Sequence, residues 1–332
     1  MSSQFSRVKE IPGSVWLLST LLVILVFYVG IRTGGFNMNL ERIPWGILVP
    51  CAAAFAFGHS YLLLGWQRAV TLFLMATIIS FCFEYVGEST GAIFGPYEYT
   101  GVLGWKLFDR IPFLIPLAWY MMFYPSYIIA NLLGEGGPIP HRTKLVPIVW
   151  LSILSAMVMT AWDLTMDPVM SYHPCYPGTL DCFPEALDQA EVGHPAWIWG
   201  VDGTHFGVPL ENFRGWLITS FVVFFFYRLV EIRLPLVTAP GMNSRFLLSL
   251  PVGVYAGMAM VDTWLGYPEI EDVHLISPFV MGIPAFFAAF QLFANRTDLP
   301  LWPSKKHSVS ERQIEGTGPF KELMSSEQGD AS

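Results

Sequence analysis

The stretch LVPIVWLSILSAMVMTAW, residues 145–162, contains no charged side chain. A helix that crosses the hydrocarbon core of a bilayer needs roughly 20 mostly apolar residues. Seven more windows approach or reach that length: residues 14–31, 43–65, 69–87, 111–133, 213–230, 246–264 and 273–294. The pattern predicts an all-α, polytopic transmembrane bundle of about eight spans within residues 1–298. The window 213–230 is long enough only if its helix starts close to Glu211, Asn212 and Arg214, so seven spans is the alternative.

Composition and charge agree with a membrane protein. Hydrophobic residues make up 53% of the 332 positions and charged residues 13%, about half the usual charge content of a soluble domain. With a cytoplasmic N-terminus, 13 of the 18 Lys and Arg residues, Arg228 among them, fall on the cytoplasmic side, as topology rules require. We therefore expect a multi-pass protein of the cell inner membrane with both termini in the cytoplasm. Residues 299–332 are expected to form a disordered cytoplasmic tail, and the net charge of −8 indicates no nucleic-acid partner.

Five acidic residues enter or end the predicted spans. The pairs Glu84/Glu88 and Asp163/Asp167 are each four residues apart and so share a helix face, and Asp262 lies near the end of a third span. The spans that carry them run in the same direction, so all five reach the non-cytoplasmic face. Charge at membrane depth is costly and marks functional sites. The alternative is that these acids lie in water at the interface.

Irregular connections are expected at the same face. Residues 88–105 and 202–216 are rich in Gly, Pro and Thr, and Pro168 is expected to end a helix directly after Asp167. Irregular backbone at membrane depth is tolerated where it lines a cavity. His59, within a span, is more readily a hydrogen-bonded structural histidine than a functional one. The candidate substrate contacts are Phe94, Tyr97, Trp119, His205, Phe206, Asn212, Trp216 and His59, and Glu211 is a further candidate acid.

Motifs and cysteines restrict the chemistry. No P-loop, dinucleotide-binding, zincin or nucleophile-elbow motif occurs, so we expect acid–base chemistry without a cofactor. Cys51 and Cys82 lie inside spans and are expected in the core. Cys175 and Cys182 lie in a non-cytoplasmic loop where a disulfide is chemically allowed, and both the disulfide and free thiols remain open. No ligand spacing indicates a metal site.

A carboxylic acid in a dry pocket can protonate a weakly basic alkene, and other carboxylates and aromatic faces then stabilise the cation. In this context four blocks are informative: residues 84–100 (EYVGESTGAIFGPYEYT), 111–119 (IPFLIPLAW), 162–168 (WDLTMDP) and 207–216 (GVPLENFRGW). Together they resemble the signature blocks of the membrane carotenoid-biosynthesis hydratases, the CruF-type carotenoid 1',2'-hydratases and the bisanhydrobacterioruberin hydratases. The resemblance covers about residues 80–265.

The resemblance implies hydration of the terminal 1',2' double bond of an acyclic carotenoid end, of the lycopene or γ-carotene type, to a tertiary alcohol. The substrate would come from the bilayer, and association with other carotenoid-biosynthesis enzymes is expected. The chemistry predicts Asp163 or Asp167 as the proton donor. Glu84, Glu88 and Asp262 would orient water or stabilise the cation, with Glu211 and Asn212 as second choices.

Two other functions stay open. A small membrane carotenoid cyclase is one, because residues 209–212 and 268–271 are imperfect copies of its Pro-x-Glu-Glu/Asp motif. A proton-coupled transporter is the other, since such proteins use intramembrane acids as a relay. The crowding of the acids at one face counts against transport.

Overall fold

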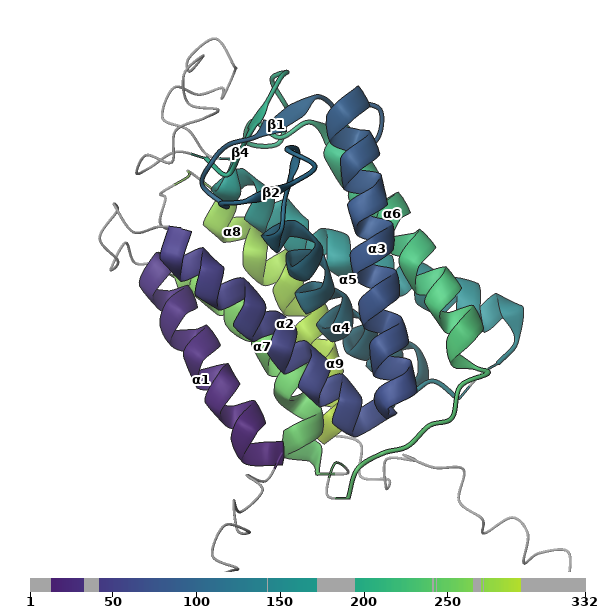
Figure 1. The fold of residues 1–332 in the computed structure, drawn as a ribbon. Coiled ribbons are helices and arrows are strands. Elements are labelled where there is room, and N and C mark those ends of the chain that lie inside the picture. Colours follow the sequence, from purple (N-terminus) through teal and green to yellow (C-terminus); the bar gives the residue numbers. More distant parts are fainter. Residues whose placement is uncertain are drawn as a thin grey trace, which may run out of the picture. The chain divides into compact units, whose positions relative to one another are not determined.

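The chain forms a helical bundle. The computed structural model describes residues 13–32, 42–141, 143–171, 195–240, 242, 244–264, 270 and 272–293. Over these residues the structure is mainly helical (Figure 1), and the predicted all-α class is confirmed. The elements are α1 (Gly13–Arg32), α2 (Arg42–Leu64), α3 (Trp66–Thr90), β1 (Tyr97–Tyr99), β2 (Lys106–Leu107), β3 (Ile111–Pro112), α4 (Leu114–Glu135), α5 (Leu145–Met170), β4 (Trp197–Trp199), α6 (Leu210–Glu231), α7 (Arg245–Trp264), α8 (Val273–Ser277), η3 (Pro278–Gly282) and α9 (Ile283–Phe293).

Most of these helices have the length and composition of membrane spans. Among the described residues, α2, α3, α5, α6, α7 and the continuous α8–η3–α9 segment are long and apolar enough to cross a bilayer, and α1 is apolar over Trp16–Ile31. The protein is therefore an integral membrane protein. The window 213–230 also forms a helix of spanning length, because α6 starts at Leu210, beside Glu211 and Asn212.

The central helix is α4, which packs against α2, α3, α5, α7 and α9 (Figure 1). Its tyrosines and Asn131 lower its hydropathy, and it is not among the six apolar spans. These polar side chains are nevertheless fully buried. Each contacts a polar partner inside the bundle, as Tyr120 does with Ser60 Oγ at 3.2 Å. Protein, rather than lipid, surrounds this helix.

Glycines and short strands organise one end of the bundle. Gly91 adopts a left-handed conformation (φ 67°) and its N–H bonds to Gly87 O, which ends α3. The chain then forms β1, which pairs antiparallel with β4 so that Tyr97 faces Trp199 and Tyr99 faces Trp197. The pairing joins the segment after α3 to the segment before α6 (Figure 1). Strands β2 and β3 form a second, smaller pair.

Three local expectations were wrong. Residues 88–90 are the end of α3, and the last part of residues 202–216 is helical because Pro209 precedes α6 in an extended conformation and an apolar run follows it. Helix α5 does not end at Asp167 but continues through Pro168 to Met170. Cys82 is exposed rather than in the core, since α3 presents much of its apolar surface outward, and Cys51 on α2 is half-buried. The Cys175/Cys182 expectation and the predicted tail lie outside the described residues.

Candidate functional site

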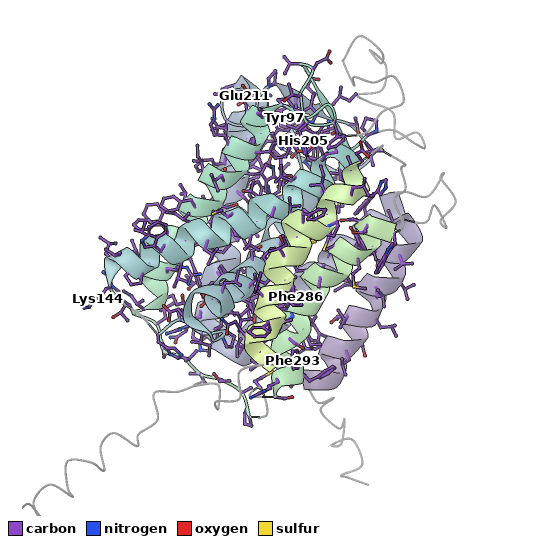
Figure 2. The ribbon with its side chains drawn as sticks, turned by 180° about the vertical axis from the view of Figure 1, so that it is seen from behind. Tyr97, Lys144, His205, Glu211, Phe286 and Phe293 are labelled. Carbon is purple, nitrogen blue, oxygen red and sulfur yellow. The ribbon has the colours of Figure 1, made fainter. Side chains whose placement is uncertain are left out.

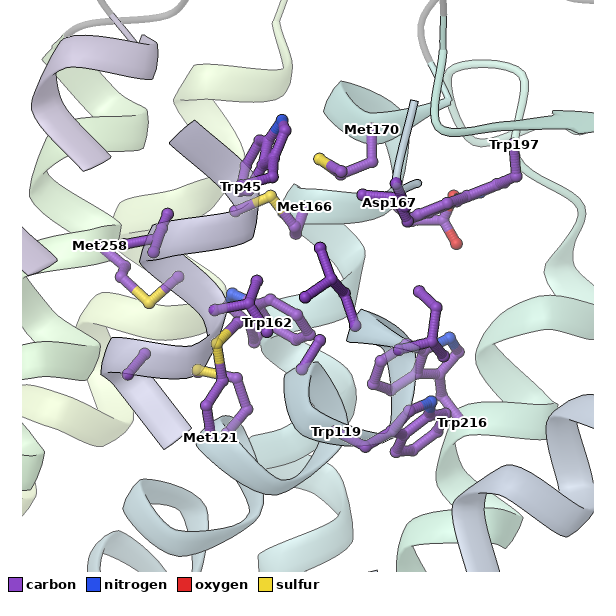
Figure 3. Close-up of a pocket in the computed structure, with 18 of the residues that line it drawn as sticks. Trp45, Trp119, Met121, Trp162, Met166, Asp167, Met170, Trp197, Trp216 and Met258 are labelled. Carbon is purple, nitrogen blue, oxygen red and sulfur yellow. The ribbon is translucent and has the colours of Figure 1, made fainter. Parts of the chain in front are cut away.

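A cavity of about 100 Å³ lies between helices of the bundle and the β1–β4 pair. Side chains from helices α1 to α7 and from the β1–β4 pair line it. Figure 3 shows Trp45 and Met258 on one side, Trp119 and Trp216 on the other, and Asp167 beside Trp197. The lining is almost wholly Trp, Tyr, Phe, Met and aliphatic side chains. Glu84, Asp167 and Asn212 are its strongly polar members.

Glu84 on α3 accepts three hydrogen bonds from neutral donors. Its Oε2 accepts from Tyr97 Oη at 2.5 Å and from Tyr99 Oη at 2.8 Å, and its Oε1 accepts from Trp119 Nε1 at 2.8 Å. Burial, and next the Glu84 carboxyl, raises the pKa of Tyr97 and of Tyr99 well above the ordinary value, so both hydroxyls keep their protons. The Glu84 carboxyl is therefore held as an acceptor in an apolar cavity.

Asp163 and Asp167, one turn apart on α5, share a single amide donor. Asn212 Nδ2 donates to Asp163 Oδ2 at 2.9 Å and to Asp167 Oδ2 at 2.6 Å, so these two oxygens lie no more than about 5.5 Å apart. Trp197 Nε1 donates to the other Asp167 oxygen at 3.0 Å. At an effective dielectric constant of about 20, two full charges about 5 Å apart repel by about 3 kcal/mol. This repulsion favours a pair that keeps one proton.

Aromatic rings form a platform next to these acids. Trp119 and Trp216 stack with ring centroids 3.7 Å apart and planes 14° apart. Trp162 packs edge-on against Trp216 at 5.7 Å, and Phe94 lies 6.3 Å from Trp119. All four line the cavity. Indole faces attract cations, so this platform suits a positively charged intermediate.

The other predicted acids lie away from the cavity lining. Glu88 pairs with Arg110 at 2.7 Å, and Glu211 is exposed. Asp262 is buried and accepts a hydrogen bond at 2.5 Å from Tyr28, which does line the cavity. The structure thus brings Glu84 and Asp167 to one cavity. Asp163 lies outside the lining and is linked to Asp167 by hydrogen bonds from Asn212. Asp262 also lies outside the lining and accepts the hydrogen bond from Tyr28.

His205 supports the helix that carries the aspartates. Pro168 has no N–H to offer Leu164 O, which would otherwise be its helical acceptor. His205 Nε2 lies 2.9 Å from that oxygen and donates to it. Phe206 packs against the imidazole ring at 4.8 Å. Neither His205 nor Phe206 lines the cavity, and the hydrogen bond explains how α5 continues through its proline.

His59 repeats this arrangement on another helix. Pro251 within α7 cannot donate to Leu247 O, and His59 Nε2 donates to it at 2.7 Å. The other ring nitrogen, Nδ1, lies 2.5 Å from Tyr124 Oη and accepts from it. Both nitrogens of this fully buried ring are engaged, and the ring does not line the cavity. The contacts agree with the structural interpretation of His59.

Sequence reasoning missed several donors to the acids, namely Tyr99, Trp197 and Tyr28. One signal was available, because Tyr97 and Tyr99 are two residues apart and share a face of any strand.

Figure 2 shows Tyr97, His205 and Glu211 gathered at one end of the bundle, with Lys144 and Phe293 toward the other. Among the described residues, no group of three or more His, Cys, Asp or Glu is placed to hold a metal ion.

A second buried polar cluster was also not predicted from the sequence. Glu231 accepts hydrogen bonds from Tyr127 Oη and from Arg68 Nη1, the latter at 3.3 Å. Arg228, which was expected in a cytoplasmic flank, is only 2% exposed. Its Nη2 donates to Ser155 Oγ at 2.9 Å, and its guanidinium lies 4.7 Å from the centroid of the Tyr127 ring. The cluster lies at the end of α6 opposite to Asn212.

Fold and site together define a polytopic helical membrane protein whose apolar cavity contains buried carboxyl groups and an aromatic platform. The family described as carotenoid biosynthesis protein matches residues 45–176 and 184–281, and the chain belongs to this family. A bisanhydrobacterioruberin hydratase from Haloarcula japonica is 25% identical over 156 residues, which is 47% of this chain. The chain spans 43% of that relative's length in the match. No solved structure matches the chain.

Proposed function

We propose that the protein adds water across the terminal 1',2' double bond of an acyclic carotenoid end and forms a tertiary alcohol. The observation that carries the proposal is a cavity of apolar and aromatic side chains in which Asp167 and Glu84 present carboxyl groups to the interior. The apolar lining suits a polyene that dissolves in the bilayer, and the carboxyls supply acid–base groups. A distant relative named as a hydratase supports hydration as the class of reaction.

Asp167 is the proposed proton donor, because it lines the cavity whereas Asp163 does not. Its proton passes to the less substituted alkene carbon, and the C=C electron pair forms the new C–H bond. The other carbon becomes a tertiary cation. Asn212 bridges the two aspartates and fixes the donor while Asp163 supplies the second carboxyl of the pair. General acid catalysis of this kind contributes about 10²- to 10⁴-fold to the rate.

The cation is stabilised by the charge of Glu84 and by the faces of Trp119 and Trp216. Water then forms the C–O bond, and its surplus proton returns to the aspartate pair. One water is consumed, the C=C bond becomes C–H and C–OH, and the acid is restored. Because Glu84 already accepts three hydrogen bonds, it fits the role of a fixed counter-charge.

The proposed orientation of the protein in the membrane follows from the distribution of its charged residues. The bias of basic residues supports cytoplasmic termini, with the acids at the non-cytoplasmic face, and we place the protein in the cell inner membrane as part of the proposal. We further propose that the carotenoid enters from the bilayer and that other carotenoid-biosynthesis enzymes associate with the protein.

Expression in hosts that accumulate lycopene or γ-carotene tests the reaction. The parent protein should give a pigment heavier by one water for each modified end, as measured by mass spectrometry. Asp167→Asn should lower the product at least about 100-fold, and Asp163→Asn should lower it less. Glu211→Gln is the matched control, because Glu211 is exposed and its variant should resemble the parent.

Three results would contradict this account. An isomer of unchanged mass would identify a cyclase, in which an internal double bond captures the cation. Unchanged pigment with the parent protein would show that the protein does not act on these carotenoids. Normal hydration by both aspartate variants would refute the site.

A further inference from the structure

The β2–β3 hairpin exposes aromatic rings on a strained turn. Phe108 and Asp109 at its tip have φ values of 52° and 57°, in the left-handed region that non-glycine residues rarely adopt. Phe108 is 75% exposed and Trp105 is 72% exposed. In water, the turn would combine an unfavourable backbone with an unfavourably solvated ring. An apolar surrounding removes the second of these costs.

The tip of the hairpin continues the apolar outer face of α3. The Phe108 ring lies 5.9 Å from the ring of Phe81 and 6.2 Å from that of Tyr85. Residues 74, 78, 81 and 85 follow the spacing of a single helical stripe. Leu74 and Ile78 on this stripe are 46% and 56% exposed on a helix of spanning length. A stripe that faces lipid along α3 therefore ends at Phe108.

The cations of the hairpin are already bonded within the protein. Lys106 Nζ donates to Tyr99 O at 2.7 Å, and Arg110 Nη1 bonds to Glu88 Oε2 at 2.7 Å. Toward the outside the hairpin exposes the carboxyl of Asp109 and aromatic rings, including Trp105, whose ring lies 6.1 Å from that of Phe113. Tryptophan side chains such as that of Trp105 concentrate at the boundary between lipid headgroups and acyl chains.

The segments that flank the hairpin reach the cavity. Leu103 lies just before it, Leu114 and Ile115 lie just after it, and all three line the cavity. Residues 103–115 thus contact the cavity at both ends and expose aromatic rings between them. This segment therefore connects an exposed aromatic surface to the lining of the cavity.

We propose that the β2–β3 hairpin is seated in the interfacial region of the lipid bilayer and forms the side of the cavity through which a lipid-dissolved molecule enters. The occupant of the exposed aromatic surface is lipid. The seating in lipid is independent of the reaction, whereas the entrance role rests on the proposed hydration.

A photocrosslinking experiment tests the seating. The full-length protein carries p-benzoylphenylalanine in place of Phe108 or, in a separate variant, Trp105, and is reconstituted in vesicles of radiolabelled phosphatidylethanolamine and phosphatidylglycerol. The control position is Glu98, an exposed residue of β1 at the same end of the bundle. Positions 108 and 105 should capture several-fold more lipid than position 98. Equal capture at all three positions would overturn the proposal, whether or not the protein is a hydratase.

The entrance role is tested by kinetics with lycopene supplied in the same vesicles. Phe108→Asn keeps a residue that tolerates the left-handed turn but removes the ring. It should raise KM at least about threefold with kcat unchanged, as expected when access rather than chemistry is impaired. Phe286→Asn is the matched control, because Phe286 is 66% exposed on α9, and its KM should not change. A lower kcat at unchanged KM for Phe108→Asn would refute the entrance role.

Discussion

The hydrogen bond from His205 Nε2 to Leu164 O gives a quantitative prediction, because Pro168 has no N–H that could donate to that oxygen. His205→Ala leaves the carbonyl freed by Pro168 without its donor. A buried polar group that loses its partner costs about 1–3 kcal/mol, so the free energy of unfolding should fall by that amount. The rate should also fall, since Leu164 lies between the two aspartates on α5. Unfolding in mixed detergent micelles and carotenoid hydration together measure both effects.

Replacement of the proline should reverse the loss. Pro168→Ala restores an N–H that can donate to Leu164 O, so adding it to His205→Ala should recover about 1–2 kcal/mol. His141→Ala is the control, because His141 is exposed and its loss should change stability by less than about 0.5 kcal/mol. If the effects of His205→Ala and Pro168→Ala are additive, or if His205→Ala costs nothing, the bond does not support α5.

Other contacts give shorter tests. Asn212→Leu should lower kcat about tenfold or more, because the aspartates lose the donor that fixes them; Asn131→Leu, equally buried but bonded to a carbonyl, should lower thermal stability and leave kcat unchanged. Tyr97→Phe removes one of the donors to Glu84 and should lower kcat about tenfold at constant KM, and an unchanged kcat would contradict the counter-charge role. Arg68→Met should lower the free energy of unfolding by about 1–3 kcal/mol, because Glu231 and Leu234 O both lose hydrogen bonds from Arg68 while Arg228 stays near Glu231; an unchanged free energy of unfolding would show that these bonds do not stabilise the bundle.

The helices could be predicted because their signal is local. Apolar length marks α5 or α7 without any knowledge of neighbours, and the four-residue spacing places Asp163 and Asp167 on one face. The buried α4 was recognisable from its apolar run, although its tyrosines look unfavourable for a span. Their partners on other helices, such as Ser60 and His59, remove that cost but are remote in sequence.

The missed features depend on pairing between distant segments. Tyr99 and Trp197 reach Glu84 and Asp167 because β1 and β4 pair across about 100 residues, a register that no local pattern specifies. Arg228 looked like a flanking cation since basic residues set topology, but the ring of Tyr127 and the hydroxyl of Ser155 hold it inside the bundle.

The origin of the product oxygen tests the central claim most directly. The purified protein, reconstituted in vesicles that contain lycopene, is incubated in water enriched in heavy oxygen, and the pigment is analysed by mass spectrometry. The account predicts a tertiary alcohol that carries one heavy oxygen for each modified end, and almost none of it with Asp167→Asn. A product of unchanged mass, or an alcohol whose oxygen does not come from the water, would contradict hydration by the buried carboxyl groups.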